Sequence, residues 1–121
     1  MPGSLEFVKS NSTTSNVSSL SVDDCFTTEY DIYKCVLEID EVGTEIAIET
    51  RLQNSSGPVT SSNYDHAYRF MRVGSGSYSS QGNQGNDKWQ FTMYNEGAVG
   101  GFYVMYVYNP VDSSKYTFAH W

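Results

Sequence analysis

The chain has 121 residues, of which fourteen are acidic and seven basic, so its formal net charge at pH 7 is −7. This length predicts one domain that buries roughly two-thirds of the surface its unfolded chain exposes. The negative charge and the dispersed basic residues oppose binding to nucleic acid or to an anionic membrane surface.

The composition favours sheets and turns over helices. Ten Tyr, six Phe and two Trp supply much of the apolar content, and Ser, Gly, Asn and Thr fill the polar positions. We therefore expect almost no helix. The sequence has no run of about 18 apolar residues, the length needed to span a membrane. The opening MPGSLEFVKSNS is too short and too polar for a secretion leader. Synthesis in a cytoplasm is expected.

Two short strands are expected near the N-terminus. Residues 5–9 alternate apolar with charged side chains, and residues 17–22 are only weakly apolar. A weakly apolar strand suits the edge of a sheet, where it needs few packing partners.

The clearest pattern lies in residues 22–52, where two further strands are expected at 32–41 and 45–53. One face of each is apolar and the other charged, the period-two pattern of a half-buried strand. The apolar set is Tyr33, Cys35, Leu37 and Ile39 in the first strand, and Ile46, Ile48, Thr50 and Leu52 in the second. We predict that the two strands form a β-hairpin, whose dry face needs a second sheet to cover it.

A polar corner, residues 27–31 (TTEYD), precedes this hairpin. Its acidic residues and the nearby Asp23 and Asp24 could bind Ca²⁺, which takes oxygen ligands. We favour a structural turn in which Asp31 and the threonines bond to the backbone. Cys25 and Cys35 flank the corner. A disulfide is conceivable, but cytoplasmic synthesis favours free thiols packed as small hydrophobes.

The second half of the chain alternates loops with strands. Residues 54–63, with Gly57-Pro58, predict an exposed loop, and residues 74–88 predict a long Gly/Ser/Gln/Asn loop. A strand at 64–73 is favoured over a helix, although the apolar spacing fits both. Further strands are expected at 89–94, at 102–109 and in the segment 115–121.

The strand at 102–109 is apolar or aromatic on both faces and should be central and covered on both sides. Seven or eight short strands with turn signals between them predict an all-β fold. We expect a single antiparallel β-sandwich domain over residues 1–121, of jelly-roll or related topology.

No pattern points to catalysis. The sequence has no GxSxG, CxxC, HExxH or P-loop motif, and His66 and His120 lie far apart. The carboxylates at 38, 40, 41, 45 and 49 fit a solvated face of the hairpin. We expect no enzyme activity, no cofactor and no metal.

The composition of the predicted loop 74–88 fits ligand binding better than it fits catalysis. Tyr, Ser, Gly and Asn in loops combine rigid aromatic contact with adaptable hydrogen bonding, which suits a sugar or protein ligand. The candidate contact residues are Tyr78, Gln81, Asn83, Asn86 and Trp89. The alternative is that Trp89 belongs to the core and that the loop is a flexible connection without a binding role.

Three segments carry a family resemblance: SLSVDDCFTTEYDIYKCVLEID, LQNSSGPVTSSNYDHA and MYVYNPVDSSKYTF, together with the opening MPGSLEFVKS. In this order and spacing they resemble virion proteins of tailed marine phages, especially cyanophages. The resemblance covers nearly the whole chain, and its motifs are structural.

The resemblance implies a β-sandwich structural protein of the virion, in a tail fibre, a head fibre or a capsid decoration. Such proteins usually work as oligomers, often trimers, together with other virion proteins, and some attach to host surface glycans. The similar proteins continue beyond the YTF segment, and the resemblance leaves open whether this chain is a truncated form of a longer protein.

Overall fold

The computed structural model describes residues 5–39, 46–72, 76–93 and 101–121. These residues form strands, turns and irregular segments and contain no helix, and every strand pair among them is antiparallel. The prediction of an all-β fold is therefore confirmed. Within the described ranges, no helix long and apolar enough to cross a membrane is found.

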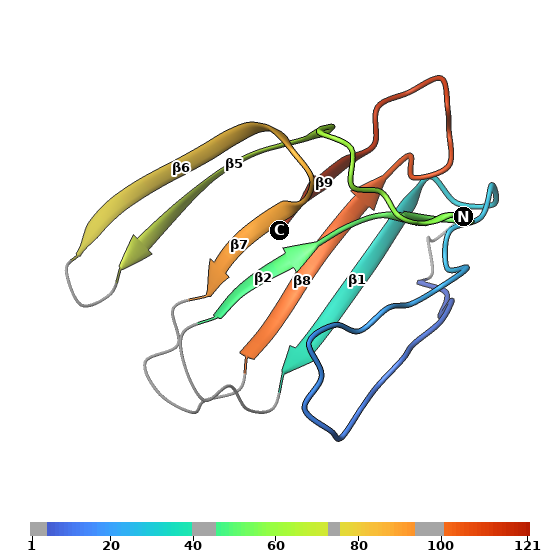
Figure 1. Cartoon of the computed structure of the whole chain (residues 1–121), viewed down its shortest axis with the longest axis horizontal. Helices are drawn as coiled ribbons and strands as arrows, with labels where there is room; N and C mark the ends of the chain where they lie inside the picture. The colour runs from blue at the N-terminus through green and yellow to red at the C-terminus, as the bar shows by residue number, and fades with distance from the viewer. Residues whose placement is uncertain (1–4, 40–45, 73–75, 94–100) are drawn as a thin grey trace. The chain divides into compact units, whose positions relative to one another are not determined.

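Contacts divide the chain into two compact units (Figure 1). The first unit, residues 1–39 with 101–121, holds β1 (Ile32–Ile39), β8 (Gly101–Tyr108) and β9 (Phe118–His120). The second, residues 40–100, holds β2 (Ile46–Thr50), β3 (Gln53–Asn54), β4 (Gly57–Pro58), β5 (Tyr64–Arg72), β6 (Ser77–Asn86) and β7 (Trp89–Met93). That the sheets join in one sandwich stays a prediction.

The first unit is a three-stranded sheet in the order β1-β8-β9. The β1–β8 ladder runs from Ile32 opposite Tyr108 to Ile39 opposite Gly101. Directly opposite residues share a face, so Tyr33 and Val107 lie on one face, where both are buried. The last strand is held in the sheet because β9 pairs with β8.

The predicted hairpin of strands 32–41 and 45–53 is wrong in its pairing. Its alternation is right in β1, where Lys34 and Glu38 are exposed and Tyr33 is buried, but β1 pairs with β8 and β2 pairs with β7. The eight-residue ladder to the apolar β8 gives the backbone of β1 its hydrogen-bond partners. Residues 40–45, with the predicted turn, lie outside the described residues.

Three other expectations in this unit need correction. Residues 5–9 and 17–22 are not strands. A short alternation of apolar and polar side chains does not by itself provide a neighbouring strand to which the backbone can hydrogen-bond. Side chains tie this segment instead: the Lys9 ammonium donates to the Asp23 carbonyl at 2.7 Å. The central strand β8 is not covered on both sides, since Phe102 is 67% exposed.

The second unit contains a long hairpin, the ribbon, formed by β5 and β6. The predicted strand at 64–73 is thus confirmed as β5, but the predicted loop 74–88 is wrong, because residues 77–86 are a ten-residue strand. Pairing with β5 satisfies the backbone of β6 whatever its side chains are. A bulge near Tyr64 is closed by Gly85, whose φ of +65° favours glycine and whose N–H donates to Asp65 Oδ1 at 2.7 Å.

The predicted exposed loop 54–63 is partly structured. Its first residues make the small β3–β4 hairpin, with Gly57 at a φ of +110°. The Asn54 side chain accepts a hydrogen bond from the Ser56 N–H at 2.8 Å and closes the turn. Asn54, Ser55 and Ser56 are exposed, as expected.

Candidate functional site

The ribbon carries four of the predicted contact residues, Tyr78, Gln81, Asn83 and Asn86, all on β6. In the register, Gln81 is opposite Tyr68 and Asn83 is opposite His66, so these four side chains share one face. Tyr78, three positions from Gln81, belongs to the other face and is exposed. Asn86 lies at the base, beyond the bulge. The predicted residues therefore form no single cluster.

Trp89 belongs to the core of the second unit, which confirms the alternative interpretation of this residue. It is 6% exposed and meets the ring of Tyr64 edge-on, with centroids 5.2 Å apart. The Tyr64 hydroxyl accepts from the Leu52 N–H at 3.0 Å and donates to the Val59 carbonyl at 3.1 Å. Burial raises the pKa of Tyr64. Trp89 is therefore unavailable for stacking on a ligand.

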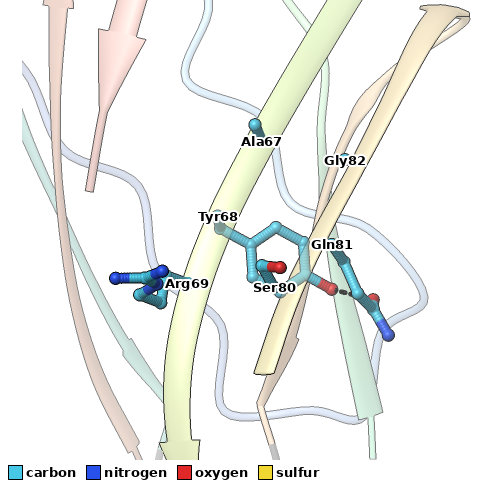
Figure 2. Close-up of a pocket in the computed structure, with 6 residues that line it drawn as sticks. All are labelled: Ala67, Tyr68, Arg69, Ser80, Gln81 and Gly82. Atoms are coloured by element: carbon cyan, nitrogen blue, oxygen red, sulfur yellow. Dashed lines mark hydrogen bonds between the residues drawn. The ribbon is translucent and has the colours of Figure 1, made fainter. Parts of the chain in front are cut away.

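A shallow, open depression of about 510 Å³ lies on the middle of the ribbon (Figure 2). It is lined by Ala67, Tyr68, Arg69, Ser80, Gln81 and Gly82. Of the predicted contact residues, only Gln81 lines it.

Close approach of the two strands fixes this part of the ribbon. A Cβ added at Gly82 would lie 3.1 Å from the His66 carbonyl oxygen and 3.3 Å from the Ala67 Cβ. The Tyr68 hydroxyl donates to Gln81 Oε1 across the strands. Figure 2 shows this pair on one side of β5 and the guanidinium of Arg69 on the other.

The depression offers hydroxyl, amide and guanidinium groups, which suits hydrogen bonding to a polar ligand. No member of its lining pairs a nucleophile with a base. Sequence reasoning missed Tyr68, Arg69 and Ser80 because the loop assignment of 74–88 hid the pairing of β6 with β5. Treating that tract as a polar strand would have placed Tyr68 opposite Gln81 and Arg69 opposite Ser80.

Two ion pairs join the end of β2 to the connection between β6 and β7. Arg51 Nη2 lies 2.9 Å from Asp87 Oδ2, and Arg51 Nε donates to the Asp87 carbonyl at 3.1 Å. Lys88 Nζ lies 2.6 Å from Glu49 Oε1. The hydrogen bond from Arg51 lowers the pKa of Asp87, so the folded chain favours the ionised carboxylate at the base of the ribbon.

This pairing predicts a pH dependence. Because the pKa of Asp87 is lower in the folded state, its contribution is complete above the unfolded value of about 3.9 and is lost as pH falls through the folded value. The urea midpoints of unfolding of the native chain and of Arg51→Gln should differ at pH 7 and converge as the pH is lowered below about 3.9. A difference that persists unchanged at low pH would contradict this role of the pair.

The corner at residues 27–31 is a structural turn, as favoured. Thr27 Oγ1 accepts from the Glu29 N–H at 3.3 Å. The Tyr33 hydroxyl accepts from the Thr27 N–H at 2.8 Å and donates to the Thr27 carbonyl at 3.0 Å. Asp31 contributes through its backbone carbonyl, which accepts from the Asn109 N–H. Within the described ranges, no group of three His, Cys, Asp or Glu side chains could hold a metal.

Both cysteines are free thiols, and each is half-buried. Burial raises the pKa of Cys25, and burial together with the neighbouring Cys25 raises the pKa of Cys35. Thiolate is the nucleophilic form, so burial disfavours the nucleophilic form of both side chains.

Comparison with known proteins adds no family to these observations. No family model, curated protein or solved structure matches the chain.

Proposed function

We propose that this chain is a non-enzymatic structural protein of a bacteriophage virion, in a tail fibre, a head fibre or a capsid decoration. It acts by associating with further copies of itself and with other virion proteins. Support comes from the all-β fold and from the resemblance of its sequence segments to virion proteins of tailed marine phages.

The observation that carries the proposal is the open face of the β1–β8 sheet. Ile32, Val36 and Phe102 are 57%, 54% and 67% exposed. The register places Val36 opposite Val104 and Glu38 opposite Phe102, so these apolar side chains share one face. Apolar side chains gathered on one exposed face mark an association surface, as a subunit of a particle requires.

The test is to locate the chain in purified phage particles. Mass spectrometry of particles from a phage that encodes the chain should detect it in a fixed ratio to the major capsid protein. A particle reconstruction would then assign it to the tail or the capsid. Absence from particles, with the protein present only in the infected-cell lysate, would reject the proposal.

A second candidate function is binding of a host surface glycan in the depression on the ribbon. The favouring observation is that polar side chains able to hydrogen-bond to sugar hydroxyls line the depression on both faces of the ribbon, Tyr68 with Gln81 on one face and Arg69 with Ser80 on the other. The native chain and an Arg69→Ala/Gln81→Ala variant should be compared on a glycan array. Tyr116→Ala is the matched control, because Tyr116 is 95% exposed in the other unit.

Binding that is lost in the double variant and kept in the control supports this candidate. No binding by the native chain, or equal binding by all three proteins, rejects it.

A further inference from the structure

The outer edge of β1 has no strand beside it in the described sheet, since the order β1-β8-β9 places it at one end (Figure 1). The Asn109 N–H donates to the Asp31 carbonyl at 2.8 Å, one position before the β1–β8 ladder begins. Backbone groups of alternate residues point to opposite sides of a strand. Residues 33, 35, 37 and 39 therefore face β8, and residues 32, 34, 36 and 38 present their N–H and C=O groups outward.

Among the described residues, no backbone hydrogen bond outside the strand ladders reaches residues 32–38. The outward positions also carry the exposed side chains Ile32, Lys34, Val36 and Glu38. Lys34 and Glu38 are placed symmetrically about Val36. A lysine on an edge strand normally discourages pairing with another strand. If β1 does pair, the residue opposite Lys34 must therefore be acidic.

We propose that two copies of this chain join through β1, antiparallel, about a two-fold axis at Val36. In this register Val36 lies opposite Val36 of the partner subunit, and Lys34 lies opposite Glu38 of the partner subunit. The pairing occurs twice by symmetry. On the other face, Tyr33 meets Ile39 of the partner subunit and Cys35 meets Leu37 of the partner subunit. Lys34 and Glu38, the two charges of β1, are matched, and Tyr33, Cys35 and Val36 have apolar neighbours. Ile32 falls opposite position 40 of the partner subunit, which lies outside the described residues.

Other registers fit the same pattern less well. A shift of two residues in either direction places Val36 opposite Lys34 or Glu38 of the partner subunit. A two-fold axis at position 34 or 38 would place like charges directly opposite, which is destabilising. The occupant of this edge is thus a second copy in one register.

The contact rests on the pattern of β1 and does not depend on the chain being a virion protein. It also gives a closed two-fold dimer, unlike the trimer that the family resemblance implies.

The register is tested with a cysteine at its centre. In a Cys25→Ser/Cys35→Ser background, Val36→Cys should form an intermolecular disulfide on mild oxidation. Hydrogen-bonded antiparallel pairs have Cα atoms about 5.5 Å apart, within the disulfide range of about 4.4–6.8 Å. Lys34→Cys is the matched control and should stay reduced alone, yet cross-link when mixed with Glu38→Cys. Equal cross-linking by Val36→Cys and Lys34→Cys would overturn the register.

The charges are tested by reversal. Analytical ultracentrifugation of the native chain should show a concentration-dependent dimer. Lys34→Glu or Glu38→Lys should each weaken it about tenfold, because both pairs become repulsive, and Lys34→Glu/Glu38→Lys should restore it. A native monomer or trimer, or a double variant as weak as the single ones, would overturn the proposal. A dimer absent from phage particles would reject the virion function and leave this contact standing.

Discussion

Replacing Trp89 with alanine should lower the free energy of unfolding of the second unit by about 3–5 kcal/mol, the usual cost of removing a buried Trp or Phe side chain. Trp89 is 6% exposed and packs edge-on against Tyr64. The loss includes the cavity and the support of Tyr64, whose hydroxyl holds the backbone of Leu52 and Val59. Since small domains are stable by only about 5–15 kcal/mol, the unit should come close to unfolding.

The measurement is urea denaturation followed by circular dichroism. Tyr116→Ala, at a 95% exposed aromatic residue, should change the unfolding free energy by less than about 0.5 kcal/mol. Tyr64→Phe keeps the ring and removes the hydroxyl, so it should cost about 1–3 kcal/mol through the unsatisfied backbone groups. Equal effects of Trp89→Ala and Tyr116→Ala would show that Trp89 does not support a core.

Tyr33→Ala should have a similar effect on the first unit, about 3–5 kcal/mol by analogy with other large aromatic residues. The ring of Tyr33 lies 4.9 Å from that of Phe26 and 6.0 Å from that of Tyr30, in edge-on contacts. Its hydroxyl bonds both backbone groups of Thr27. Tyr33→Phe, which removes only the hydroxyl, should cost about 1–3 kcal/mol and speed hydrogen exchange at the Thr27 amide.

The control is the same chemical change at Tyr30, whose hydroxyl donates to the exposed Glu6. This bond raises the pKa of Tyr30 to about 12, yet the hydroxyl lies at the surface, so its loss should leave the stability almost unchanged. Thermal unfolding and amide exchange would distinguish the two tyrosines. If Tyr30→Phe and Tyr33→Phe behave alike, the Thr27 contacts do not stabilise the corner.

The two units thus use the same device. In each, a buried tyrosine at the start of a long strand packs edge-on against another aromatic ring. Its hydroxyl then bonds one backbone N–H and one backbone carbonyl in the preceding segment. Part of the high aromatic content of the chain therefore fixes loops to strands.

The sequence by itself determined the fold class and which side chains of a strand share a face. Alternation correctly separated Tyr33 from Lys34 and Glu38 in β1, because side chains of a strand point to opposite faces in turn. It also identified the corner at residues 27–31 as a turn, since a threonine hydroxyl can bond the backbone nearby. These features depend on local geometry, so a short stretch of sequence is enough to predict them.

Only the tertiary structure decided which strands pair. β1 joins β8 across more than sixty residues of chain, and β6 is a strand despite a sequence typical of a loop. Every residue except proline offers the same backbone hydrogen-bonding groups. The side chains of one strand therefore do not identify which distant strand will pair with it. For this reason the depression around Tyr68, Arg69 and Ser80, and the free edge of β1, became visible only once the pairing was known.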